Sequence, residues 1–222
     1  MRSTLWLAVF GASGASGRAL IDAALDRGHT VRAQCRAAST WTAPGSVEVF
    51  RGEPVDPVVA RATVAGANAV VLLFGPRPPH RDVFCAAATR TVIEAMKHKE
   101  VHRLLCVTGA MAGVDTAHLT FPARLMAAAF RRSRPEVAAD RDEQERLVRD
   151  SGLAWTLVKP PRLTHSPHVS GCSAAADARI GLRSSISRAT LADFMLQAIE
   201  QNLHLGELAI PRGTLHVLHE SN

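Results

Sequence analysis

The chain of 222 residues contains no tyrosine. Many reductases of carbonyl compounds use a tyrosine, activated by a nearby lysine, to protonate the oxygen that gains charge during hydride transfer. The composition excludes that mechanism. The absence of tyrosine therefore favours a conjugated or redox-active acceptor, which delocalises the incoming charge and can take its proton from solvent.

Two further catalytic signatures are missing. No G-x-S-x-G segment occurs, so the sequence lacks the turn that exposes the nucleophile of many hydrolases. No C-x-x-C pair occurs among the four cysteines, Cys35, Cys85, Cys106 and Cys172. Cys35 and Cys106 lie in apolar runs that are typical of buried thiols. We expect a reducing, cytoplasmic setting. The opening run LWLAVF ends at a glycine turn and is too short to span a membrane, so we expect no signal peptide.

The chain also lacks an acidic excess. Lys and Arg number 26 against 20 Asp and Glu, which gives a formal net charge of +6 with neutral histidines. The arginines are scattered, apart from Phe130–Arg134 (FRRSR), which fits a solvated helix end. Because neither an aromatic-interleaved basic stripe nor a helix-turn-helix pattern is present, we expect no nucleic-acid or membrane partner. A phosphate-bearing small ligand suits this charge.

Strand-like apolar runs alternate with helical stretches along the chain. This alternation predicts right-handed βαβ crossovers and an α/β fold with a doubly wound parallel sheet, in a single domain over residues 1–222. The predicted strands are Leu5–Phe10, His29–Arg36, Val47–Gly52, Ala69–Gly75, Arg103–Gly109, Ala154–Pro161 and Leu215–Leu218. The predicted helices are Ser16–Gly28, Asp56–Gly66 (with Asp56 as cap and Pro57 in the first turn), Asp82–Lys99, Glu136–Gly152 and Ala189–Gln201.

Two segments show little regular pattern, Gly109–Pro135 and Arg162–Arg188. Each follows the carboxyl end of a predicted strand, where a doubly wound sheet opens its ligand crevice. We expect them to form a small irregular lobe on the substrate side. The first segment carries apolar side chains that fit either a lid over an aromatic substrate or ordinary core packing: Met111, Leu119, Phe121, Leu125, Met126 and Phe130.

The stretch VFGASGASGRAL places three glycines at a spacing of three, between an apolar strand and an amphipathic helix. Gly11 permits a sharp turn, Gly14 lets backbone amides approach a ligand, and Gly17 allows the helix to pack closely on the strand. The helix N-terminus then offers unpaired N–H groups to a pyrophosphate, and Ser13 and Ser16 add hydroxyl groups. This context predicts a Rossmann-type dinucleotide site formed by Gly11, Ala12, Ser13, Gly14, Ala15, Ser16 and Gly17.

The second predicted strand ends without an acidic residue to accept from ribose hydroxyls. It ends instead at Arg36, whose planar guanidinium can pair with a 2′-phosphate, followed by the hydroxyls of Ser39 and Thr40. Arg32 lies four residues before the tip and is a weaker candidate. The sequence therefore favours NADPH/NADP⁺ over NADH as the cofactor.

With these elements placed, the chain resembles the atypical short-chain dehydrogenase/reductase families, which include NmrA-like proteins and the flavin reductase also called biliverdin-IXβ reductase. The resemblance covers most of the chain and is carried by segments from Gly11–Gly17, Thr63–Gly75, Leu104–Met111, Leu147–Leu163 and Ile186–Ile199. It implies that Arg36 holds the 2′-phosphate and Glu53 flanks the adenine. It further implies that the rest of the cofactor contacts Gly75, Pro76, Arg77, Thr108, Gly109, Pro160 and Pro161, with Arg162 closing over the nicotinamide.

The sequence departs from the flavin reductases at Gly109, where they often have serine, at Arg162, where they often have histidine, and at Thr40, where some have arginine. We expect hydride transfer to a conjugated acceptor such as a flavin or quinone, in a monomer or homodimer. The polar groups nearest the expected crevice are Thr108, His118, Arg124, Glu145, Arg162 and His165. Of these we select Thr108, Arg162 and Glu145 as catalytic candidates, and Thr108 can either donate to the substrate or bind the ribose.

Two other functions remain open on the sequence alone. The protein can be an NmrA-like sensor that binds NADP(H) and passes the signal to a partner, or a redox-neutral epimerase or isomerase. The pair His165 and His168 has the H-x-x-H spacing, but it lies in a loop without an adjacent carboxylate, so we expect no metal site.

Overall fold

The computed structural model describes residues 4–76, 83–113, 115–168, 172–174 and 179–212. Within them, seven parallel strands form one sheet in the order β10-β6-β5-β4-β1-β2-β3. The strands are β1 (Trp6–Phe10), β2 (Thr30–Cys35), β3 (Glu48–Arg51), β4 (Ala69–Leu72), β5 (Arg103–Val107), β6 (Ala154–Val158) and β10 (Glu207–Ala209). The strand order reverses between β1 and β4, and such a switch point opens a crevice at the carboxyl ends of the strands.

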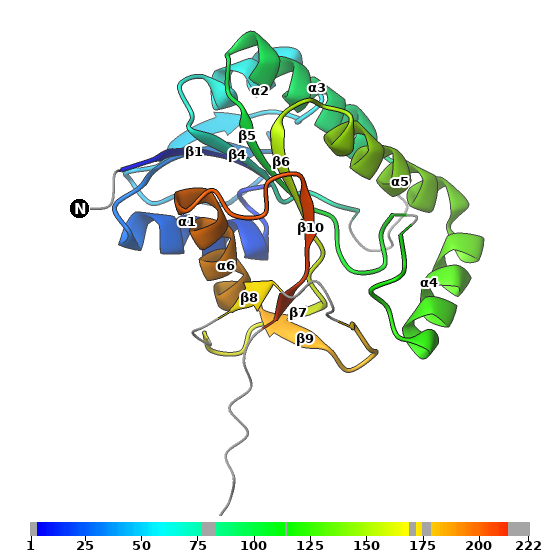
Figure 1. The fold of residues 1–222 in the computed structure, drawn as a ribbon. Coiled ribbons are helices and arrows are strands. Elements are labelled where there is room, and N and C mark those ends of the chain that lie inside the picture. Colours follow the sequence, from blue (N-terminus) through cyan, green and yellow to red (C-terminus); the bar gives the residue numbers. More distant parts are fainter. Residues whose placement is uncertain (1–3, 77–82, 114, 169–171, 175–178, 213–222) are drawn as a thin grey trace, which may run out of the picture.

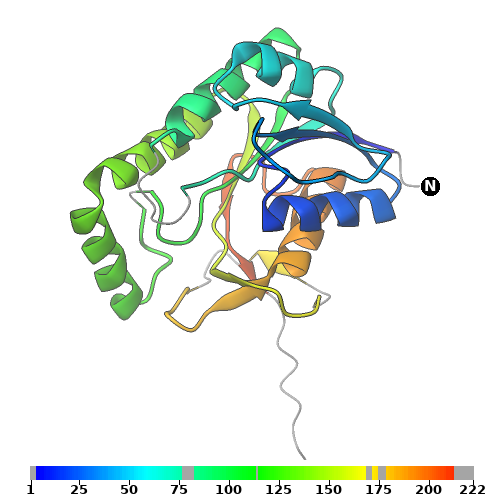
Figure 2. The same cartoon turned by 180° about the vertical axis from the view of Figure 1, so that it is seen from behind.

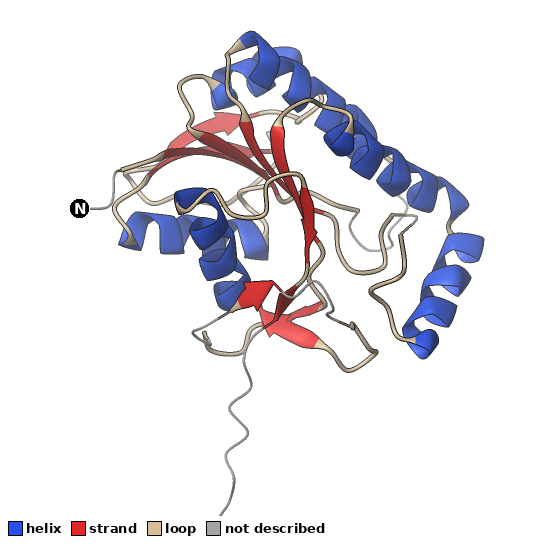
Figure 3. Cartoon of the chain, in the orientation of Figure 1, coloured by secondary structure: helices blue, strands red, loops and turns tan. Residues whose placement is uncertain are grey.

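Helices cover both faces of this sheet (Figures 1 and 3). One face carries α1 (Ala15–Asp26) and α6 (Arg188–Glu200), which lie side by side in both views (Figure 2). The other face carries α2 (Pro57–Val64), α3 (Cys85–His98) and α5 (Pro135–Arg149). A further helix, α4 (Phe121–Ser133), packs against α5 at one end of the molecule.

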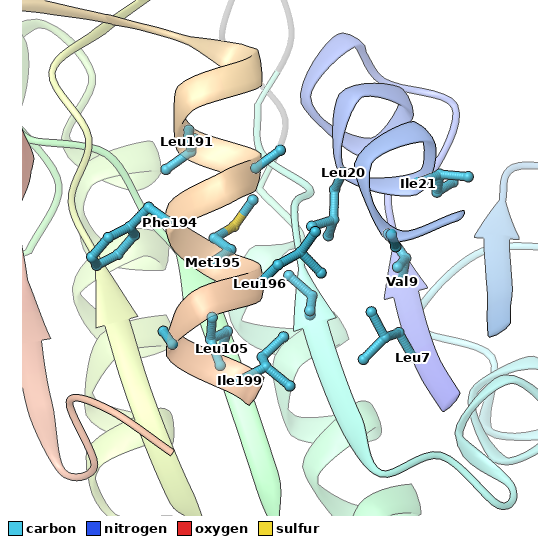
Figure 4. Close-up of a cluster of buried hydrophobic side chains, with 14 of the residues drawn as sticks. Leu7, Val9, Leu20, Ile21, Leu105, Leu191, Phe194, Met195, Leu196 and Ile199 are labelled. Atoms are coloured by element: carbon cyan, nitrogen blue, oxygen red, sulfur yellow. The ribbon is translucent and has the colours of Figure 1, made fainter. Parts of the chain in front are cut away.

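The alternation of side chains along β1 builds two cores. Leu7 and Val9 face α1 and α6, whereas Ala8 and Phe10 face α2 and α3, and all four are fully buried. Figure 4 shows the first core, in which Leu20 of α1 and Leu196 of α6 lie close to the β1 side chains. A strand buried on both faces explains why the opening run is apolar without interruption.

A polar link ties α1 to α6. Arg27 contacts Asp193 and Glu200, and His29 donates from Nε2 to Glu200 Oε1 at 2.9 Å. The backbone N–H of Leu5 donates to His29 Nδ1 at 3.3 Å, which leaves the proton on Nε2. The link fixes α6 beside the helix that begins at the glycine turn.

The fold class is as predicted, and most expected elements are present with bounds shifted by a few residues. Asp56 caps α2 by accepting from the N–H of Val58 at 2.8 Å, with Pro57 in the first turn. Two expectations are incomplete. The segment predicted to be irregular contains the helix α4, and the edge strand β10 was not predicted. The predicted strand Leu215–Leu218 lies outside the described residues.

The second irregular segment contains two short ladders. β7 (Arg162–Thr164) pairs with β9 (Ser185–Ser187), and β8 (Ser173–Ala174) pairs with β11 (Pro211–Arg212). The first ladder places Arg162 directly after the strand β6 and its two prolines. This segment therefore borders the carboxyl edge of the sheet, where the candidate site lies.

Candidate cofactor and substrate groove

The turn after β1 needs glycine at two positions for steric reasons. Gly11 has a φ of +79°, and a Cβ there would lie 2.9 Å from the backbone carbon of Leu73. A Cβ on Gly17 would lie 2.5 Å from the carbonyl oxygen of Gly11 and 2.6 Å from that of Ala12. The turn is thus pressed between the start of α1 and the end of β4.

The N-terminus of α1 has no side-chain cap. Gly14 is the N-cap residue, and the first turn carries no acidic side chain. The start of α3 differs, because the Asp140 carboxylate accepts hydrogen bonds from the N–H groups of Phe84, Cys85 and Ala86. The uncapped amides of α1 and the positive end of its dipole suit an anionic group such as a pyrophosphate.

A cavity of about 600 Å³ opens in front of this turn. Its wall includes the glycine turn, the end of β2 and the end of β4, with Arg36 and Glu53 as its charged side chains among the described residues. Gln34, which the sequence did not single out, accepts from the N–H of Gly11 at 3.1 Å and donates to the carbonyl of Gly52 at 2.6 Å. One buried amide therefore fixes two walls of the cavity.

Arg36 follows the last residue of β2 and lines this cavity. The loop after it is braced by Arg51, which donates to the carbonyls of Ser39 at 2.8 Å and Trp41 at 3.2 Å. Ser39 itself does not line the cavity, and its hydroxyl accepts from the N–H of Trp41. Arg32 pairs with Glu48 at 2.9 Å, near the opposite end of β2.

A second cavity of about 600 Å³ adjoins the first, and both include Leu73, Phe74 and Gly75 in their walls. The described residues that line it include three arginines and no carboxylate. The lining is mainly apolar, with side chains from the loop after β5, from α4 and from the double proline after β6. The predicted residues in this wall are Ser16, Gly75, Pro76, Thr108, Gly109, Pro160, Pro161 and Arg162.

A buried polar network lies directly behind this second cavity. Thr108 Oγ1 donates to Glu145 Oε1 at 2.8 Å, and Lys159 Nζ lies 3.0 Å from the same oxygen. The Lys159 side chain is 0% exposed and that of Glu145 is 5% exposed. Burial lowers the pKa of Lys159, and the Glu145 carboxylate opposes that shift. The sequence signal for Lys159 was a single lysine at the end of an apolar strand, and it was missed.

Arg141 is a buried cation at the same place. It donates from Nη1 to Gln144 Oε1 at 2.6 Å and from Nη2 to the carbonyl of Thr108, and it lines the second cavity. Among the described residues, no carboxylate forms an ion pair with it. Burial raises the pKa of the adjacent Cys85 to about 11 despite Arg141, so this thiol stays protonated and is no nucleophile at neutral pH.

His118 is the other buried titratable group of this region. Its Nε2 donates to the carbonyl of Ala110 at 2.7 Å, and its Nδ1 has no hydrogen-bond partner among the described residues. Burial lowers the pKa of His118, which keeps it neutral. It supports the loop after β5 from behind and does not line either cavity.

The structure divides the predicted site residues into three groups. Twelve of the seventeen predicted cofactor positions line one cavity or the other, whereas Ala12, Ala15, Gly17 and Ser39 line neither and Glu145 lies behind Thr108. Arg77 lies outside the described residues. The apolar residues that were candidates for a lid lie in different environments. Met111, Met126 and Phe130 line the second cavity. Leu119 is fully buried, and Phe121 and Leu125 are exposed.

These features define a Rossmann-type α/β protein with two adjoining cavities at the carboxyl edge of its sheet. A family model described as NAD(P)H-binding matches residues 11–202, and the chain belongs to this family. The matched range begins at the first glycine of the turn and ends after α6. It therefore includes the walls of both cavities.

Solved structures share this fold at low sequence identity. The anaerobillin reductase ChuY from Escherichia coli O157:H7 is 22% identical, with a TM-score of 0.74 over 94% of this chain and 97% of that chain. SP1627 from Streptococcus pneumoniae TIGR4, a proposed NADH-flavin reductase, is 21% identical, with a TM-score of 0.72 over 94% and 99%. A short-chain dehydrogenase/reductase from Veillonella parvula DSM 2008, solved with NADP, is 14% identical, with a TM-score of 0.75 over 94% of each chain.

Among the described residues, no helix combines the length and the apolar character needed to cross a membrane.

Proposed function

We propose that the protein is an NADPH-dependent reductase of a conjugated acceptor, such as a flavin or a quinone. The observation that carries the proposal is the pair of adjoining cavities. The first cavity is lined by residues of the glycine turn and by Arg36. The second cavity is mainly apolar, and its lining includes Thr108 and the double proline. A dinucleotide laid across both would place its adenosine half in the first and its nicotinamide half in the second, beside room for a flat acceptor.

The residues present fit this cofactor. The turn between β1 and α1 leaves no space for a Cβ at Gly11 or Gly17, and the N-terminus of α1 after Gly14 has no side-chain cap. Arg36 supplies a guanidinium where the extra phosphate of NADPH would lie, and no acidic residue occupies the end of β2. The NADP-bound relative from Veillonella parvula supports the same choice of cofactor.

The cofactor, when bound, supplies a hydride, which carries both electrons of the reduction. The chain's own residues orient the reactants and exclude water, since the second cavity is lined mainly by apolar side chains. Arg162 lies at the exposed edge of this cavity and Arg141 in its buried wall, so both can stabilise negative charge on the reduced acceptor. Because the chain contains no tyrosine, the acceptor delocalises that charge and takes its proton from solvent.

The descriptions of ChuY as an anaerobillin reductase and of SP1627 as a proposed NADH-flavin reductase support a conjugated acceptor for this chain as well. We include in the proposal a monomer or homodimer in a reducing, cytoplasmic compartment, with a small molecule as the partner and no role for nucleic acid or membranes. The buried, protonated thiol of Cys85 agrees with such a compartment.

The test is steady-state oxidation of NADPH by the purified protein with FMN, a soluble quinone and an isolated ketone. We expect stoichiometric consumption of NADPH with FMN or the quinone and little with the ketone. Tight cofactor binding without turnover across a broad panel of acceptors would support an NmrA-like sensor instead. Product formation with only catalytic amounts of cofactor would support an epimerase or isomerase.

A further inference from the structure

The network behind the second cavity determines the direction of the hydrogen bond made by Thr108. The Thr108 hydroxyl has one hydrogen, and this hydrogen is donated to Glu145 Oε1 at 2.8 Å. Glu145 Oε1 also lies 3.0 Å from the Lys159 ammonium. A carboxylate paired with an ammonium can only accept, so it keeps the hydroxyl hydrogen pointing away from the cavity. Because Thr108 lines the cavity, its hydroxyl can offer a ligand there only the lone pairs of Oγ1.

The geometry around Glu145 holds this arrangement in place. Gly113 has a φ of +80°, and a Cβ there would lie 2.1 Å from Glu145 Oε2. The Lys159 ammonium donates to the carbonyl of Ala112 in the same loop as well as facing Glu145. The carboxylate is therefore enclosed by Thr108, Lys159 and the Ala112–Gly113 backbone.

A fully buried lysine is costly unless it is paired, and this pair lies against one side of the cavity wall. Neither Lys159 nor Glu145 lines either cavity, so neither side chain can reach a ligand directly. Thr108 is the member of the network that does. The pair can therefore act on a ligand through the Thr108 hydroxyl and through the Ala112–Gly113 backbone, which also lines this cavity, and of these the hydroxyl is the group whose hydrogen-bonding role the pair determines.

We propose that Lys159 and Glu145 are positioning residues that hold Thr108 as a hydrogen-bond acceptor, so that the second cavity selects a ligand group that donates there. The inference rests on the proposed function, under which the donor is a ribose hydroxyl on the nicotinamide side of NADPH. It assigns Thr108 to cofactor recognition, because an oxygen that has already donated its hydrogen cannot also donate to a substrate carbonyl.

The experiment measures binding rather than turnover. Dissociation constants are measured by calorimetry for NADPH and for an analogue that lacks both hydroxyls of the nicotinamide ribose. We expect the wild-type protein to bind the analogue about tenfold more weakly, which is the value of one hydrogen bond to a buried acceptor. Thr108→Val should weaken NADPH binding by a similar factor and bind the two compounds equally, whereas Thr108→Ser should keep the preference.

The roles of Lys159 and Glu145 are tested by the same quantity, the ratio of the dissociation constants of the analogue and NADPH. Lys159 and Thr108 both donate to Glu145 Oε1, so Glu145→Gln can keep an amide oxygen at that place and should retain most of the preference for NADPH over the analogue. Glu145→Met removes this acceptor and frees the Thr108 hydroxyl to rotate, so we expect the preference to fall below about threefold. Lys159→Met should also reduce the preference, and Lys159→Arg should retain most of it. Glu143→Gln is the matched control on α5, because Glu143 pairs with Arg90 and Arg146 at the surface. It should leave the ratio unchanged.

A purely structural role would lower stability or weaken both compounds equally, without changing their ratio. An unchanged preference in Thr108→Val or in Glu145→Met, with NADPH still bound, overturns this inference and leaves the proposed function intact. A wild-type protein that binds neither compound overturns the proposed function and this inference with it.

Discussion

Under the proposed function, we expect the choice between NADPH and NADH to depend on Arg36. It follows β2 directly and lines the cavity next to the glycine turn. Arg51 braces the loop after it through two backbone carbonyls, which keeps that loop against the rim of the cavity. The sequence predicted Arg36 because a strand end is fixed by local pattern. It could not predict Arg51, whose place beside Cys35 depends on the pairing of β2 with β3.

Arg36→Gln should weaken NADPH binding roughly tenfold to a hundredfold, since hydrogen bonds to a charged group contribute about 1.5–3 kcal/mol. NADH has no 2′-phosphate, so its affinity should change by less than about twofold. Calorimetric titration with both cofactors measures the difference. Arg90→Gln, at an exposed arginine of α3, serves as the control and should alter neither affinity. An equal loss for both cofactors would show that Arg36 does not select the phosphate.

Thr108, Glu145 and Lys159 show where residue-level prediction from the sequence stops. Thr108 was a candidate because it stands at the end of a predicted strand, and Glu145, in a predicted helix, was a candidate as a polar group near the expected crevice. The hydrogen bonds that unite them connect β5, α5 and β6, which no local pattern specifies. Gln34 is a similar case, because its two partners come from the turn after β1 and from the end of β3.

At the level of elements, periodicity predicted most of the sheet and the longer helices. The prediction was wrong for α4, because its alanines favour a helix while its large apolar side chains suggested a lid or a core. Ala123 and Ala127 are buried in α4, whereas Phe121 and Leu125 are exposed. The strand β10 was missed because three residues give no measurable alternation, and its pairing with β6 alone defines it.

The close packing of α1 on the glycine turn should make both stability and cofactor binding sensitive to the side chain at position 17. Gly17→Ala would place a methyl group 2.5 Å from the carbonyl oxygen of Gly11, and the backbone has to move to admit it. We expect a loss of about 1–3 kcal/mol in the free energy of unfolding, together with weaker cofactor binding. Thermal unfolding should show a melting temperature lower by roughly 2–4 °C per kcal/mol.

Gly45→Ala is the matched control for this substitution. Gly45 is exposed, and a Cβ there would meet nothing within 4 Å. Its melting temperature and its affinity for NADPH should equal those of the wild-type protein within error. If Gly17→Ala behaved in the same way, the close packing of α1 on the turn would not be required for either stability or binding.

For the molecule as a whole, the groove crosses the point where the strand order reverses. Its walls come from both halves of the sheet, with the glycine turn and Arg36 on one side and Thr108, Arg141 and Pro160 on the other. A dinucleotide bound there contacts both halves at once. Binding should therefore stabilise the entire fold and not only the loops around the ligand.

NADPH at about a hundredfold excess over its dissociation constant should add about 2.7 kcal/mol to the free energy of unfolding. For a chain of this size, that corresponds to a rise in melting temperature of roughly 5–10 °C, measured by differential scanning calorimetry. NADH at the same concentration should give a smaller rise because it binds more weakly. Hydrogen exchange should slow at the start of α1 and at the end of β5 together. Protection confined to the α1 side would show that the ligand does not extend into the second cavity, and the reductase proposal would then lose its structural basis.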